Sequence, residues 1–168
     1  MQDLLSILEG MLSFSPKSVT KELLGGLPER SRRVLVDRFG LTPKGESRTL
    51  DAIGQEYGIT RERIRQIENH GLASVRDSES YEAQQAALED LKKAIHILGG
   101  VLAEETLLRH LGKSDADHNH IIFLLTVGHT FEQEKENADF RTRWHIDETL
   151  SEQVENALTA LYEAIEPN

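Results

Sequence analysis

Residues 48–72, RTLDAIGQEYGITRERIRQIENHGL, decide the fold expected for the first half of the chain. Their pattern predicts two short helices, 49–56 and 61–76, separated by the sequence YGIT. Gly54 lies where the two helices would cross closely, and Gly58 supplies the positive φ angle that the tight turn needs. Four isoleucines have the spacing needed to clamp the helices together: Ile53, Ile59, Ile64 and Ile67. These constraints are typical of a DNA-binding helix-turn-helix.

The second of these helices carries a face of side chains suited to reading nucleobases. With Ile64 and Ile67 pointing inward, a turn of 3.6 residues fixes the opposite face. This face consists of Arg61, Glu62, Arg65, Gln66 and Asn69, with Arg63 on its flank and Thr60 as the N-cap residue. An Arg bonds bidentately to guanine, a Gln bonds to adenine, and a Glu accepts from cytosine. Three further residues are placed to bond phosphates: Lys44, Arg48 and Thr49.

The alternative interpretation of this helix is an ordinary solvated surface, because charged residues at helical spacing often do no more than face water. Three alternating arginines alone would favour that alternative. The matching glycine, isoleucine and threonine positions favour the DNA-binding interpretation.

The other elements are predicted from hydrophobic periodicity. Helices are expected at residues 3–14, 17–24, 28–39, 89–98, 103–111, 118–128 and 150–165. Between the last two, alternate residues share one face of a predicted hairpin with ENAD as its turn: Phe140, Thr142, Trp144 and Ile146. Three helices followed by a hairpin is the order of a winged helix. The predicted fold class is therefore mainly α, with a helix-turn-helix domain followed by a winged-helix domain with a small β-hairpin.

Charge divides the 168-residue chain unevenly, although its formal total is −10. Residues 27–76 hold ten Lys and Arg against seven Asp and Glu, whereas residues 77–168 hold seven against nineteen. Phosphate backbones attract the first part and repel the second. We expect an N-terminal helical segment at 1–26, the helix-turn-helix at 27–76, a linker at 77–88 and an acidic winged-helix-like domain at 89–168. The alternative for 77–88 is a helix that leads into the last domain.

The composition excludes several classes of protein. The chain has no cysteine, which excludes disulfides, thiolate metal sites and cysteine nucleophiles. No apolar run approaches the roughly 18 residues of a membrane span, and the N-terminus lacks the basic region of a secretion signal, so we expect a cytoplasmic location and no membrane partner. No phosphate-binding glycine loop or nucleophile turn occurs, so we expect neither an enzyme nor a cofactor.

A metal site is not expected either, despite seven histidines. His118 and His120 are two positions apart, which directs them to different faces of a helix, and His129 lies beyond that helix. No cysteine assists them, and no HExxH spacing occurs.

The sequence LPERSRRVLVDRFGL…RTLDAIGQEYGITRERIRQIENHGLASVR, over 27–76, resembles the fourth conserved region of primary-type bacterial RNA polymerase sigma factors. The run TRERIRQIE is nearly diagnostic. This resemblance implies recognition of the minus-35 promoter element, with a backbone contact from Arg63. The base contacts that it implies come from Arg61, Glu62, Arg65 and Gln66. It also implies docking on the flap-tip helix of the polymerase β subunit through the apolar concave side of the region. The resemblance weakens after residue 69, because the family usually continues this helix with further lysines and arginines, whereas this chain has His70, Gly71, Ala73 and Ser74 before Arg76. A glycine inside a helix costs about 1 kcal/mol relative to alanine.

The order and spacing of the acidic second half are similar to the winged-helix domain of the RNA polymerase delta subunit. Its predicted third helix, HNHIIFLLTVG, has no Lys or Arg, and only Arg141 and Arg143 of the hairpin offer phosphate contacts. Trp144 and Phe140 are expected in the hairpin core. We therefore expect this domain to bind another protein rather than DNA.

Together these patterns predict a DNA-binding transcription regulator that recognises a minus-35-like promoter element in association with RNA polymerase. The alternative is a protein-interaction module that binds RNA polymerase or a sigma factor without sequence-specific DNA binding. The intact reading face of the second helix favours the first interpretation, since a module that binds only protein has no need of it.

Overall fold

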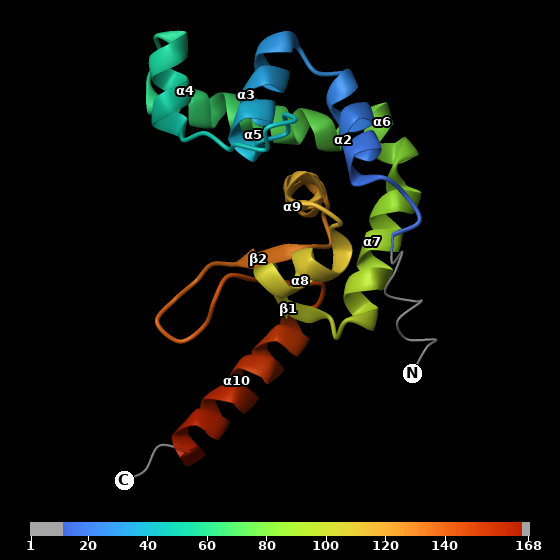
Figure 1. Cartoon of the computed structure of the whole chain (residues 1–168), viewed down its shortest axis with the longest axis vertical. Coiled ribbons are helices and arrows are strands. Elements are labelled where there is room, and N and C mark those ends of the chain that lie inside the picture. The colour runs from blue at the N-terminus through green and yellow to red at the C-terminus, as the bar shows by residue number, and fades with distance from the viewer. Residues whose placement is uncertain (1–11, 166–168) are drawn as a thin grey trace.

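The computed structural model describes residues 12–165, and four helices form its first half (Figure 1). They are α2 (Pro16–Gly25), α3 (Glu29–Phe39), α4 (Leu50–Tyr57) and α5 (Arg61–Arg76). The hydroxyls of Thr49 and Thr60 accept hydrogen bonds from the third backbone N–H of α4 and α5, which fixes where each helix begins. Gly58 ends α4 with a φ of 65°, so the expected turn between the two helices is confirmed.

Small residues allow the helices of this half to approach closely. A Cβ atom on Gly54 would lie 2.7 Å from the carbonyl oxygen of Ile59, so no larger residue fits the crossing. Val34, Ile53 and Ile64 are fully buried between α3, α4 and α5, which confirms the expected clamp. α5 runs unbroken through Gly71, where a Cβ atom would lie 3.2 Å from a methyl group of Leu35. The glycine that departs from the sigma pattern thus lets α5 pack tightly on α3.

The second half has the element order of a winged helix. It contains α6 (Glu79–Ala83), α7 (Gln85–Ile97), β1 (Val101–Ala103), α8 (Glu104–Leu111), α9 (Asp115–Val127), β2 (Glu132–Glu134), β3 (Arg143–His145) and α10 (Glu148–Ile165). The three strands form an antiparallel sheet in the order β1-β3-β2, with Trp144 opposite both Leu102 and Gln133. The mainly α fold class with a small hairpin is confirmed, and β1 is a strand that the sequence analysis did not anticipate.

Two segments differ from their predictions, and a third takes one of its two predicted forms. Residues 77–88 are largely helical, as in the alternative of a helix that leads into the next domain. The ring of Tyr81 is buried there, and its hydroxyl accepts from the backbone N–H of His129. The predicted helix 3–14 lies outside the described residues up to residue 11, and its last residues are not helical. Arg143, expected on an outer hairpin face, is buried.

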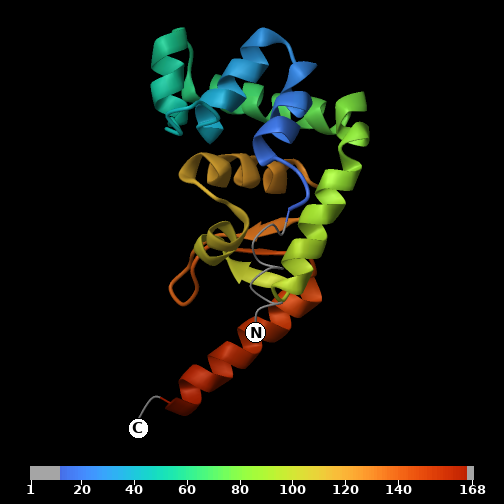
Figure 2. The ribbon, with the colours of Figure 1, turned by 45° about the vertical axis from the view of Figure 1, so that its right-hand side comes forward.

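One hydrophobic core joins the two halves. α9 lies directly against α2, α3 and α5, as two views of the ribbon show (Figures 1 and 2). Phe39 of α3 meets Phe123 of α9 edge to face, with ring centroids 5.3 Å apart. Leu23 of α2 and Leu124 of α9 belong to the same buried cluster. Consequently, the helix-turn-helix has one exposed side and one side covered by the second half.

Candidate nucleic-acid interface

The polar face of α5 is exposed, as the sequence predicts. Arg61, Glu62 and Arg65 each leave more than half of the side-chain surface open to solvent. Gln66 and Asn69 follow them along the same exposed face. Within residues 12–165, the polar contacts of these side chains all stay inside the helix-turn-helix. The second half of the chain therefore leaves this face accessible.

Neighbouring side chains on this face hold one another in place. Arg65 donates two hydrogen bonds to the carboxylate of Glu62, at 2.9 and 2.7 Å. The hydrogen bonding between the two side chains lowers the pKa of Glu62 and raises the pKa of Arg65, so both groups are charged at neutral pH. Arg61 lies 3.8 Å from Asp51 of α4. Exposed pairs of this kind contribute little to stability, so DNA can replace them at small cost.

The predicted phosphate contacts divide into two groups. Lys44 and Thr49 are exposed, although the hydroxyl of Thr49 also caps α4. The guanidinium of Arg48 is only partly exposed and is paired with two carboxylates, 2.6 Å from Glu56 and 3.3 Å from Asp37. The hydrogen bond that the guanidinium donates to Glu56 raises the pKa of Arg48. Arg48 therefore acts as a clasp between α3 and α4, and its charge is already balanced.

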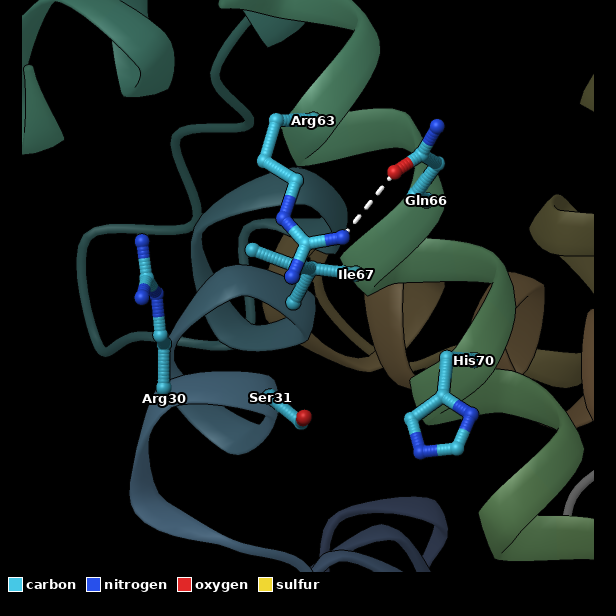
Figure 3. A pocket seen from close by; sticks show the side chains of 6 residues that line it. All are labelled: Arg30, Ser31, Arg63, Gln66, Ile67 and His70. Carbon is cyan, nitrogen blue, oxygen red and sulfur yellow. Dashed lines mark hydrogen bonds between the residues drawn. The ribbon is translucent and has the colours of Figure 1, made fainter. Parts of the chain in front are cut away.

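A basic hollow beside the reading face was not predicted. It has a volume of 290 Å³ and is lined by Arg30 and Ser31 of α3 and by Arg63, Gln66, Ile67 and His70 of α5 (Figure 3). Arg63 donates to the side-chain oxygen of Gln66 at 3.0 Å, so the flank and the face are connected. The run RSRR at 30–33 was the available signal. Its proximity to α5 depends on tertiary packing, which the sequence does not display.

This arrangement supplies the two kinds of group that duplex DNA requires. The first kind is on the exposed face of α5, which carries guanidinium and amide groups and one carboxylate acceptor. The second kind is the pair of guanidinium groups of Arg30 and Arg63, which lie beside that face. The first group can bond base edges and the second can bond the anionic backbone. The N-terminal turns of α5 are the part of such a helix that meets bases in the major groove.

The side of the helix-turn-helix opposite the reading face is apolar and is covered by α9. Asn119 of α9 donates to the carbonyl oxygens of Gly40 and Gly45, at 3.1 and 2.8 Å. Arg76 of α5 donates to the carbonyl oxygens of Thr126 and Val127, at 2.7 and 3.1 Å. These bonds attach both ends of α9 to the first half. A helix from another protein can occupy this side only after α9 has left it.

The second half has little to offer a DNA backbone. α9, the helix that would enter a groove in a DNA-binding winged helix, has no Lys or Arg and is largely buried. The expectation that Arg143 offers a phosphate contact is wrong, because its guanidinium pairs with Glu134 and lies 3.2 Å from Glu155. Arg141 is exposed and lies 3.2 Å from Glu105. The acidic surroundings of both arginines disfavour an anionic ligand.

The histidines do not assemble into a site. Among residues 12–165, no three His, Asp or Glu side chains are grouped so as to hold a metal ion. His120 is buried on α9, and burial, followed by the charge of Lys17, lowers its pKa, whereas Asp117 acts in the opposite direction. Over the same residues, no helix has the length and apolar content needed to cross a bilayer.

The fold and the exposed face define the first half as a helix-turn-helix of the DNA-binding class. Residues 23–77 match the family described as Sigma-70, region 4. Over 55 residues the chain is 44% identical to the RNA polymerase principal sigma factor HrdD of Streptomyces viridifaciens. This alignment covers 33% of the chain and 16% of that relative, so the chain spans less than a fifth of the relative's length. The expected similarity of this part of the chain to sigma region 4 is thereby confirmed.

Proposed function

We propose that this protein is a transcription regulator that binds a minus-35-like promoter element through the exposed face of α5, in association with RNA polymerase. The observation that carries the proposal is the accessibility of Arg61, Glu62, Arg65 and Gln66 in a domain that matches sigma region 4. All four side chains face solvent, and α9 packs on the other side of the domain.

In this mechanism α5 enters the major groove with its N-terminal turns against the base edges. Arg65 bonds guanine once its pair with Glu62 is released, and Glu62 then accepts from a cytosine. Arg30 and Arg63 contact the backbone from the basic hollow, together with Lys44, and so set the register.

The acidic half serves protein contacts in this proposal. Its net charge of −12 between residues 77 and 168 opposes DNA, and its α9 is already packed on the helix-turn-helix. Docking of the polymerase β flap on the apolar side of the domain therefore requires α9 to be displaced. While α9 stays packed on the helix-turn-helix, association with polymerase uses the outer surface of the acidic half.

The test is a selection of bound duplexes from a random pool at fixed salt, with and without core RNA polymerase, followed by variants on the selected sequence. Arg65→Ala should reduce affinity for that sequence on the order of 10- to 100-fold and relax specificity at one position. Arg109→Ala removes a comparable exposed arginine from α8 and serves as the control, with little expected change.

Two results would contradict the proposal. Failure to enrich any sequence, with or without polymerase, would favour a protein-interaction module without sequence-specific DNA binding. An equal loss on all duplexes for Arg65→Ala would make this side chain a phosphate contact rather than a base contact.

A further inference from the structure

The C-terminal helix α10 extends away from the rest of the molecule (Figures 1 and 2). Its first two turns are anchored to the sheet, because Ser151 is buried and Glu155 lies 3.2 Å from Arg143. Beyond Glu155, every residue from 156 to 165 is exposed. A free helix of this length is marginal in water, since helices shorter than about 12–15 residues rarely persist alone.

The projecting part of α10 carries an apolar stripe that nothing covers within residues 12–165. Leu161, Tyr162 and Ile165 are 54%, 65% and 67% exposed, in a protein whose other large apolar side chains are mostly buried. The stripe consists of Val154, Leu158, Leu161 and Ile165, with Tyr162 beside it. The spacing of four, three and four residues is that of the seam of a two-stranded coiled coil. Such a contiguous apolar stripe marks an interaction surface.

The stripe is complementary to itself. If two α10 helices run antiparallel about an axis between positions 159 and 160, Val154 lies in one layer with Ile165 of the other copy. Leu158 then lies in one layer with Leu161 of the other copy. One flank of the seam is formed by Ala157 and Ala164, whose small side chains permit a close approach of the two helices. An isologous contact of this kind closes into a dimer and cannot propagate.

The positions of the charges also favour a second copy over a basic partner. The helix has four glutamates and no Lys or Arg. Glu152 and Glu163 lie away from the seam, and Glu155, which is beside it, is already paired with Arg143. Two copies therefore meet without an unpaired charge at the seam, whereas a basic helix would find no free carboxylate there. The net charge of −10 on each chain opposes pairing only at long range, where salt screens it.

We infer that α10 is a homodimerisation helix that pairs antiparallel with α10 of a second copy through Val154, Leu158, Leu161 and Ile165. The contact spans only about 18 Å of helix, so it lies near the low end of specific interfaces and is reversible. α10 is at the end of the molecule remote from α4 and α5 (Figure 1), which leaves the reading face of each copy accessible. This inference is independent of whether α5 binds DNA.

Light scattering after size exclusion provides the first test, on the full chain. The mass should rise with concentration from 18.9 kDa towards twice that value. Leu158→Asp should remain at 18.9 kDa throughout, whereas Thr159→Asp, which places the same charge one residue further on the outer face, should behave as the parent. Both substitutions fall in the projecting part of α10, and equal thermal unfolding would confirm that both variants are folded.

Salt and orientation provide two further tests. Dimerisation should strengthen between about 0.05 and 0.5 M salt, since two chains of equal charge repel less when screened. Because the parent has no cysteine, Val154→Cys mixed with Ile165→Cys should yield a disulfide-linked heterodimer in preference to either homodimer. A mass of 18.9 kDa at every concentration would overturn the inference, as would dimers that persist in Leu158→Asp or homodimeric cross-links from a parallel pair.

Discussion

Arg76 is the side chain whose removal best tests whether the two halves unfold as one unit. Its guanidinium donates to the carbonyl oxygens of Thr126 and Val127, which end α9. A hydrogen bond from a charged donor is worth about 1.5–3 kcal/mol, and water can reach the vacated carbonyls in part, so Arg76→Ala should cost about 2–4 kcal/mol in total. With a urea dependence of about 2 kcal/mol per molar, the midpoint should fall by about 1–2 M.

The assay follows urea unfolding by two signals. Trp144, the single tryptophan, lies 3% exposed in β3 of the second half and reports there by fluorescence. Far-UV circular dichroism reports mainly on the helices of both halves. We expect one coincident transition in the parent, and an equal shift of both signals in Arg76→Ala, because α9 belongs to the core of both halves.

A matched control is available on α3. Arg32→Ala removes an arginine whose ion pair with Glu29 is exposed, so its midpoint should barely change. Two separate transitions in the parent, or an Arg76→Ala variant whose Trp144 transition does not move, would refute the single-unit reasoning.

Three smaller perturbations test the local arguments. Gly54→Ala should destabilise the helix-turn-helix by about 1–3 kcal/mol, seen as a lower melting temperature, because its Cβ would meet the backbone oxygen of Ile59 at 2.7 Å. Thr60→Ala should cost about 1 kcal/mol in urea unfolding through loss of the α5 cap. Burial lowers the pKa of His120 below the value of about 6.5 that it has in the unfolded chain. Below about pH 6.5 the unfolded chain therefore binds a proton at this side chain more readily than the folded protein does. The free energy of unfolding should therefore have its full value above that pH and fall as the pH drops through it. His120→Gln should flatten the dependence of the urea midpoint on pH.

The local signals of the helix-turn-helix were sufficient to place its elements. Gly54, Gly58 and Thr60 each meet a requirement that a short segment displays by itself: a close crossing, a positive φ angle and an N-cap. Local signals also place elements of the second half. Gly99 and Gly100, with positive φ angles, follow the end of α7, and the alternation around Trp144 predicts a strand. β1 was missed because its three residues lie directly between two predicted helices, with no longer alternating run around them such as the one around Trp144.

The parts that failed depend on contacts between distant segments. Arg143 looked like an outward residue by alternation, yet α10 covers that face and brings Glu155 to it. The pairing of Arg48 was also not foreseen, because Asp37 and Glu56 converge on it only when α3 and α4 are packed. Arg30 and Arg63 line one hollow only because α3 and α5 pack against each other. Pattern analysis of one segment cannot supply these partners.

Under the proposed function, the position of α9 determines from which side DNA can approach. Because α9 is fixed to the apolar side of the helix-turn-helix, most of the negative charge is held on the side away from α5's exposed face. The Debye length at physiological salt is about 8 Å, which is less than the roughly 10 Å width of one helix. Repulsion from the acidic half is therefore weak at the reading face but strong for a duplex that approaches from the other side. If α5 binds DNA as proposed, the duplex should therefore approach the chain in one orientation only.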